Sequence, residues 1–154
     1  MTIEQSTLDE IARVFKEQWC ADYIVTRGRV HTSSSVRGLS AYVDGKLVGL
    51  VTYCIRAEEC EMVSLDSFSE GIGIGSALIA RVMVAARQNY CRRVFLITTN
   101  DNTQALKFYQ KRGFSLVAVH RNALEESRRL KPSIPAIGMD GIRIQHEIEM
   151  EIVL

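Results

Sequence analysis

The sequence predicts an α/β fold, in which helices flank a β-sheet around one hydrophobic core. The chain has 154 residues, and a chain of this length can bury about two thirds of the surface that its unfolded form exposes. Residues 60–114 alternate between strand-like and helix-like patterns, which favours a right-handed crossover within one sheet. Asp44-Gly45 separates two apolar-patterned runs, as in a tight antiparallel hairpin. We therefore expect one domain over residues 1–154.

The N-terminal half is expected to begin with a helix and to continue as strands. Thr7 and Glu10 have the spacing of a capping box, and apolar residues then recur at helical spacing up to Trp19. Residues 23–26 are rich in β-forming side chains, and the polar residues 32–35 are expected to form a connection. The two hairpin strands and one further strand are expected at residues 39–43, 47–53 and 60–65.

The C-terminal half is expected to alternate helices with strands. Residues 72–86 carry apolar side chains at helical spacing after a glycine-rich start. A second helix is expected from Thr103 to Lys111, because Gly113 follows at a position where helices commonly end. Apolar residues alternate with glutamates over residues 147–154, which predicts a half-buried strand. The other expected elements are a strand at 94–99, a short helix at 122–130 and a loop at 131–141.

Composition argues against several classes of function. The formal net charge is +1, so the chain has no charge excess of the kind that nucleic-acid binding requires. No stretch approaches the roughly 18 apolar residues of a membrane helix, and the N-terminus lacks the pattern of a signal peptide. The four cysteines form no C-x-x-C pair, which argues against a metal site and for free thiols. We expect a cytoplasmic protein without nucleic-acid or membrane partners.

A glycine-rich segment between a predicted strand and a predicted helix carries the clearest functional signal. Glycine recurs at positions 71, 73 and 75, where it lets the backbone turn sharply and expose its N–H groups. The helix that follows adds a partial positive charge at its N-terminus. Such a loop is expected to bind a phosphate or a diphosphate.

Three kinds of phosphate ligand compete for this loop. A Walker loop requires a lysine that the segment lacks. A dinucleotide fingerprint, G-x-G-x-x-G/A, is approached within one substitution by Gly71, Gly73 and Ser76. The acidic residue expected about 20 positions later is missing, which weighs against a nucleotide-dependent oxidoreductase. Coenzyme A is the third possibility.

Two blocks of the sequence resemble those of the GNAT N-acetyltransferase superfamily. Residues 70–75 match the family's Q/R-x-x-G-x-G/A loop at Gly73 and Gly75, with Glu70 where the family usually has Gln or Arg. The resemblance covers residues 39–114, and the two blocks occur in the family's order and at its typical separation. The second block reads Asn102-x-x-Ala105-x-x-Phe108-Tyr109-x-x-x-Gly113-Phe114.

The resemblance implies a mixed, mostly antiparallel central sheet of about six to seven strands with a splayed central pair. It also implies acetyl-CoA as cosubstrate and transfer of the acetyl group to a primary amine by direct attack in a ternary complex. N–H groups near Leu65 would hold the pantetheine arm and polarise the thioester carbonyl. The residues that the resemblance assigns to coenzyme binding are Val63, Leu65, Glu70, Gly71, Ile72, Gly73, Ile74, Gly75, Ser76, Asn102, Ala105 and Phe108.

The same resemblance makes Tyr109 the candidate acid that protonates the departing thiolate. The alternative is that Tyr109 only packs on the sheet, and Asn102 either binds the coenzyme or caps its helix. Asp66 is the first candidate for the general base and Glu61 the second, although either could be a structural acid. His31 could contact the substrate, but the favoured interpretation is a surface histidine without a role.

The acceptor is not encoded by a recognisable motif. Near-neutral charge favours the amine of a small molecule over a basic protein tail. Residues 121–145 exceed a plain connection in length, so we expect them to form one wall of the acceptor pocket. The alternating final strand could pair across a homodimer. The alternative function is that of a non-catalytic acetyl-CoA sensor or interaction domain.

Overall fold

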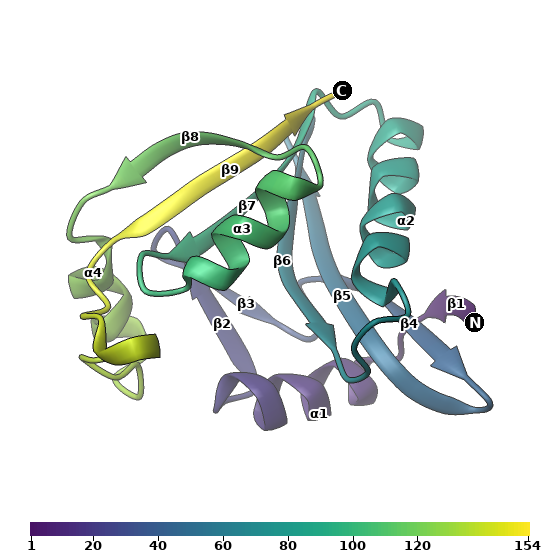
Figure 1. The fold of residues 1–154 in the computed structure, drawn as a ribbon, viewed down its shortest axis with the longest axis horizontal. Coiled ribbons are helices and arrows are strands. Elements are labelled where there is room, and N and C mark those ends of the chain that lie inside the picture. The colour runs from purple at the N-terminus through teal and green to yellow at the C-terminus, as the bar shows by residue number, and fades with distance from the viewer.

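A computed structural model describes all residues from 1 to 154 and contains strands and helices in alternation (Figure 1). The helices are α1 (Leu8–Trp19), α2 (Ile74–Gln88), α3 (Thr103–Lys111), α4 (Ala123–Leu130) and a 3₁₀ turn, η1 (Met139–Gly141). The strands are β1 (Thr2–Gln5), β2 (Tyr23–Thr26), β3 (Arg29–Thr32), β4 (Arg37–Val43), β5 (Lys46–Arg56), β6 (Glu59–Ser67), β7 (Arg93–Thr99), β8 (Ser115–His120) and β9 (Glu147–Val153).

One seven-stranded sheet has the order β1-β4-β5-β6-β7-β9-β8, and β2 pairs with β3 in a separate hairpin. Every neighbouring pair in the large sheet is antiparallel except β6 and β7, which are parallel. The mixed, mostly antiparallel sheet predicted from the resemblance is therefore confirmed, with the Asp44-Gly45 turn joining β4 to β5.

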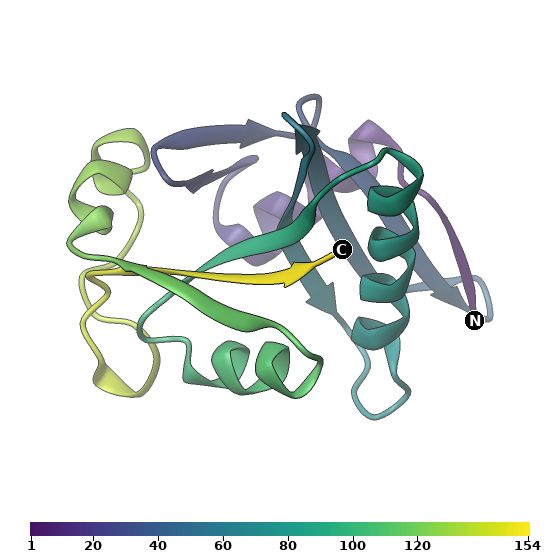
Figure 2. The same ribbon diagram turned by 90° about the horizontal axis from the view of Figure 1, so that it is seen from above.

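Helices cover both faces of the sheet, and each face has its own core. Figure 2 shows α1 and the β2–β3 hairpin on one side, with α2 and α3 on the other. Phe15 of α1 is fully buried in a cluster that includes Leu50 of β5. Leu78 of α2 is fully buried in a larger cluster that includes Leu96 of β7. The periodic apolar stripes of α1 and α2 are what attach these helices to opposite faces.

The two parallel strands at the centre of the sheet separate toward their C-terminal ends. β6 pairs with β7 only from Glu59 to Glu61, opposite residues 93–95. Val63 is a bulge, because Thr52 and Tyr53 of β5 lie opposite the residues on either side of it. A bulge bends its strand, and here it falls where β6 leaves β7. The predicted splayed pair is confirmed, and the facing edge of β6 beyond Glu61 has no partner strand.

Several elements differ from the sequence prediction. β1 and β3 were not expected, because strands of four residues give little periodic signal. Residue 32 belongs to β3 rather than to a connection, and the β2–β3 turn is built on positive φ angles at Arg27 and Gly28 instead of an Asn-Gly or Asp-Gly pair. α2 begins at Ile74, two positions after the expected start at residue 72.

The final strand is also placed differently from the expectation. β9 lies between β7 and β8 and is hydrogen-bonded to both of them. Both of its edges are occupied, so the prediction that it could pair across a dimer is wrong. Its alternation instead reflects the two faces of an interior strand.

Candidate active site

The loop after β6 presents a run of main-chain donors. Gly71 and Gly73 have φ angles of 80° and 75°, and a Cβ at either position would meet nothing within 4 Å. None of the N–H groups from Gly71 to Ser76 donates a hydrogen bond within the chain. α2 starts at Ile74 without a side-chain cap. Successive free donors at a helix N-terminus form a binding surface for an anion such as a phosphate.

Gly75 serves a different purpose from the two glycines before it. A Cβ on Gly75 would lie 2.8 Å from Cζ of Phe108, which belongs to α3. Its φ is not in the left-handed region. The sequence interpretation, in which Gly75 lets the loop turn, is therefore wrong, because Gly75 instead allows the close approach of α3 to the first turn of α2.

A cation that was not predicted as a site residue lies beside this loop. Arg112 Nε donates a hydrogen bond to Ser76 Oγ at 2.9 Å, and the guanidinium lies 3.5 Å from the centroid of the Phe108 ring. The side chain of Glu70 is exposed to solvent. Arg112 thus supplies positive charge at the start of α2.

The β6 strand offers its backbone rather than its side chains to the gap between β6 and β7. Val63 is 4% exposed and packs in the α1 core, whereas Leu65 packs against the α2 core. The predicted Val63 and Leu65 positions can therefore meet a ligand in the gap through N–H and C=O groups on the unpaired edge of β6.

Asn102, for which the sequence allows either coenzyme binding or helix capping, caps α3. Asn102 Oδ1 accepts a hydrogen bond from the N–H of Ala105 at 3.0 Å. The capping interpretation is therefore confirmed. The side-chain amide nitrogen of Asn102 makes no hydrogen bond within the chain, which leaves a donor free at the start of α3.

Asp66 and Tyr109 are brought together from β6 and α3. Trp19 Nε1 donates a hydrogen bond to Asp66 Oδ2 at 3.2 Å. Burial raises the pKa of Asp66 to about 6, and the Trp19 hydrogen bond lowers it in part. Burial also raises the pKa of Tyr109, and the negative charge of Asp66 raises it further. A carboxylate of raised pKa next to a phenol that keeps its proton forms a pair suited to opposite proton transfers.

Tyr109 also packs in the manner of a structural aromatic residue. Its ring centroid lies 5.1 Å from that of Phe108 and 5.4 Å from that of Phe114. The hydroxyl makes no hydrogen bond within the chain. Packing fixes the position of the ring. The hydroxyl is free to donate the proton that the resemblance assigns to Tyr109.

Glu61 is tied into a buried network. Thr26 Oγ1 donates to Glu61 Oε2 at 2.6 Å, and His31 Nε2 lies 2.7 Å from the same hydroxyl oxygen. Glu61 and His31 are 6% and 2% exposed. The expectation of a surface histidine is wrong, because pairing of β3 with β2 turns His31 inward. These contacts make Glu61 a weaker candidate for the base than Asp66.

A cavity of about 270 Å³ lies at the C-terminal end of α1 and is lined in part by Trp19, which donates a hydrogen bond to Asp66. It is lined by the end of α1, β2, the end of β7, the start of α4, the start of β9 and part of the segment between α4 and β9. We refer to it as the α1 cavity. The lining residues used below are Trp19, Ile24, Thr99, Lys131, Ile134 and Glu147.

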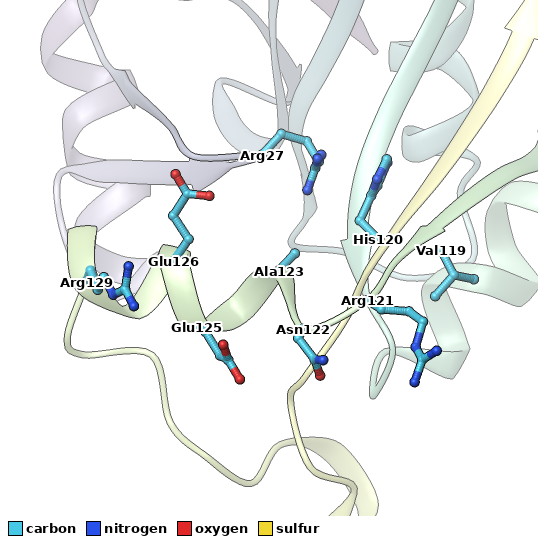
Figure 3. A pocket seen from close by; sticks show the side chains of 9 residues that line it. All are labelled: Arg27, Val119, His120, Arg121, Asn122, Ala123, Glu125, Glu126 and Arg129. Atoms are coloured by element: carbon cyan, nitrogen blue, oxygen red, sulfur yellow. The ribbon is translucent and has the colours of Figure 1, made fainter.

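The largest cavity of the molecule is a different one. It measures about 610 Å³ and lies between the β2–β3 turn, the end of β8 and α4 (Figure 3). Its walls are mainly polar and charged, and they include Arg27, His120 and Glu126. None of the predicted coenzyme-binding or catalytic residues lines it.

The cysteines are free thiols, as predicted from the sequence. All four are free, and burial raises the pKa of Cys54 to about 11 and that of Cys60 to about 12. These two thiols therefore stay protonated at neutral pH and are poor nucleophiles. The structure contains no group of three or more His, Cys, Asp or Glu side chains that could hold a metal ion. No helix has the length and apolar character needed to cross a membrane.

Comparison with known proteins identifies the family. The model of the acetyltransferase (GNAT) family matches residues 5–114. The Bacillus subtilis (strain 168) protein YdhI is 42% identical over 135 residues, which cover 87% of this chain and 84% of YdhI.

Solved structures share the fold. The IAA acetyltransferase from Bacillus cereus ATCC 14579 has a TM-score of 0.76 at 18% identity and covers 99% of both chains. A GNAT family acetyltransferase from Elizabethkingia anophelis with acetyl-CoA bound has a TM-score of 0.73 at 18% identity, over 99% of this chain and 97% of that one. The matched residues include the glycine loop and the block of α3, and the chain belongs to the GNAT family of acetyltransferases.

Proposed function

We propose that this protein transfers the acetyl group of acetyl-CoA to the primary amine of a small molecule. The observation that carries the proposal is the run of free N–H groups from Gly71 to Ser76, next to a gap in the sheet beside Asp66 and Tyr109. Acetyl-CoA bound to the Elizabethkingia anophelis neighbour supports the choice of cosubstrate.

The chain's own groups fit coenzyme A. The N–H groups of residues 71–76 would hold the diphosphate, and the unpaired edge of β6 near Leu65 would bond the amides of the pantetheine arm. Arg112 adds a cation at this loop, and the free amide nitrogen of Asn102 adds a donor at the neighbouring helix. The open space around Gly71 and Gly73 leaves room for the diphosphate.

The proposed chemistry uses one acid and one base. Acetyl-CoA, when bound, supplies an acetyl group activated as a thioester. Asp66 would take a proton from the incoming ammonium at a carboxylate oxygen, because its raised pKa makes it a stronger base than an ordinary aspartate. Tyr109 would give its phenolic proton to the leaving sulfur, because its raised pKa keeps the hydroxyl protonated until that step. The second proton that the nitrogen loses as the amide forms would restore the Tyr109 phenol.

Calorimetric titration of the purified protein with acetyl-CoA, NAD and ATP tests the cosubstrate. We expect binding of acetyl-CoA and none of NAD. Release of free thiol is then followed with acetyl-CoA and a panel of amines. Binding of NAD in place of acetyl-CoA would overturn the proposal. Tight coenzyme binding without transfer to any amine would favour a non-catalytic sensor.

A homodimer and a cytoplasmic location stay predictions. Every residue assigned above belongs to one chain, so the chemistry requires no second copy. β8 is a free edge of the sheet and exposes Leu116 and Val119, so it is the surface at which a second copy would pair. Light scattering at several protein concentrations measures the oligomeric state.

A further inference from the structure

We propose that the acceptor is a monoamine with a compact apolar body and that it binds in the α1 cavity. The inference rests on the proposed acetyl transfer and names the substrate class of the same site. Four features of the cavity support it: its position, its walls, its charges and its fixed shape.

The position of the cavity links it to the proposed base. The side chain of Trp19 lines the cavity, and its Nε1 donates to Asp66 Oδ2 at 3.2 Å. Thr99 lines it from the C-terminal end of β7, beyond the point where β7 parts from β6. The glycine loop lies on the α2 side of the sheet, so an amine in this cavity would approach the gap from the opposite face.

The walls are largely apolar and the volume is small. Seven of the thirteen lining residues are hydrophobic, among them Ile24 and Ile134. A cavity of about 270 Å³ falls just below the range of about 300–1,000 Å³ in which drug-sized ligands bind. These walls stabilise a ligand by removing apolar surface from water, and the volume limits that ligand to a compact body.

Neither charged residue of the cavity is free to pair with an ammonium group. The only charged lining residues are Lys131 and Glu147. Lys131 Nζ is bound to the carbonyl oxygens of Trp19 at 2.6 Å and Tyr23 at 3.1 Å. The carboxylate of Glu147 accepts the N–H of Arg27 at 3.2 Å from each oxygen, and the Arg27 guanidinium is 3.5 Å away.

A polycation would therefore lack partners in this cavity. Glu147 is 2% exposed and already faces a cation, and no other carboxylate lines the walls. A second ammonium of a polyamine or an aminoglycoside would be buried without a counter-ion, which is strongly unfavourable. The first ammonium has the proposed base, Asp66, next to Trp19.

The segment between α4 and β9 is held in place by hydrogen bonds to the turn between β7 and α3. Asn100 Oδ1 accepts from the N–H groups of Gln145 and His146, both at 2.9 Å. Asp101 Oδ2 accepts from the N–H of Met139 at 3.1 Å. These bonds fix the segment 131–146 at residues 139, 145 and 146, which favours selection by shape.

The test measures binding of two probes, phenethylamine and spermidine, to the full chain in the presence of coenzyme A. We expect phenethylamine to bind by calorimetry and spermidine to bind at least about tenfold more weakly. Ile134→Gln should weaken phenethylamine binding about tenfold, because it places a polar amide in the apolar wall. Ile137→Gln is the matched control, since Ile137 lies in the same segment, is 52% exposed and does not line the cavity.

The outcomes separate this inference from the proposed function. Tighter binding of spermidine than of phenethylamine, no binding of either probe, or equal losses in the two variants would overturn the acceptor class. The comparison of the two probes uses the unmodified chain, so it does not depend on whether a variant folds. Titration with coenzyme A checks that both variants are folded. Binding of phenethylamine without acetyl transfer to any amine would instead overturn the proposed function and leave the cavity assignment standing.

Discussion

The two sides of the proposed active site are built in different ways. On the coenzyme side, main-chain N–H groups of six consecutive positions, residues 71–76, have no acceptor within the chain. On the acceptor side, residues that lie between positions 18 and 147 of the sequence line one cavity. A cosubstrate can thus be recognised by a short segment of backbone, whereas the acceptor is selected by side chains that only the fold brings together. Variants that affect one side and spare the other test this division.

The largest effect is expected from Gly73→Asp, on the coenzyme side. The φ of 75° costs a side chain about 1 kcal/mol in strain, and the carboxylate would repel the diphosphate at the start of α2. Calorimetry should show acetyl-CoA binding weakened about a thousandfold. Gly45→Asp is the matched control, because Gly45 has a φ of 74°, is equally open and lies in the β4–β5 turn. Equal losses in the two variants would mean that strain alone is responsible.

Tyr109→Phe is expected to affect the chemical step rather than binding on either side of the site. It removes the hydroxyl and keeps the ring that packs on Phe108 and Phe114. We expect kcat to fall about 300-fold while the affinity for acetyl-CoA changes by less than about threefold. Tyr90→Phe, at a residue that is 87% exposed, should leave both unchanged. An unchanged kcat in Tyr109→Phe would assign protonation of the sulfur to water or to another group.

Asp66→Asn should lower kcat/KM about a hundredfold at neutral pH, because the amide cannot take a proton. The pKa of Asp66 is about 6, so the unmodified protein should gain activity as pH rises through that value. The variant should lack this limb of the profile. Retention of the limb in Asp66→Asn would show that another group titrates there.

The same substitution should have the opposite effect on stability. The folded-state pKa of about 6 exceeds the ordinary value of 3.8, so the ionised carboxylate destabilises the folded state. This penalty is nearly absent below about pH 3.5, where the carboxyl is mostly protonated in both states, grows as pH rises from 3.8 to about 6, and levels off above that at no more than about 3 kcal/mol. Asp66→Asn, which keeps an acceptor for Trp19, should therefore raise the free energy of unfolding at about pH 8 and leave it unchanged at about pH 3.5. Denaturation curves at both values measure the difference.

The smallest effect is expected from Lys131→Met, on the acceptor side. The substitution leaves the carbonyl groups of Trp19 and Tyr23 without a donor and loosens the wall that Lys131 anchors. KM for the amine should rise about tenfold, while acetyl-CoA affinity stays within about twofold. Lys46→Met is the control, at an exposed residue of the β4–β5 hairpin. A matching loss of coenzyme affinity would contradict the separation of the two sides.

Much of the fold could be predicted because its signals are local. The Asp44-Gly45 turn and the Thr7 cap of α1 are both present, and Thr7 Oγ1 accepts from the N–H of Glu10 at 3.1 Å. The splay of β6 from β7 has no local pattern and was expected only from the family resemblance. β1 and β3 were missed, since each has four residues and depends on its partner strand for its place.

The site was predictable to the extent that single segments encode it. The glycine loop, Asp66 and Tyr109 were named from the sequence, and the structure brings them to one gap. Trp19, Arg112 and Glu147 were missed as site residues, because their roles arise from contacts 47, 36 and 120 positions away along the chain. Such contacts leave no periodicity or spacing to detect. His31 was misplaced for the same reason, since its buried partners lie on β2 and β6.

Gly75 and Phe108 illustrate a dependence between residues that are distant in sequence. Because a Cβ at position 75 would collide with the Phe108 ring, the size tolerated at one position is set by the residue at the other. Phe108→Leu should therefore rescue Gly75→Ala, even though neither substitution alone preserves the packing of α3 against α2. Engineering of this scaffold has to vary the two positions as a pair, and covariation between them is expected wherever the same helices meet at this spacing.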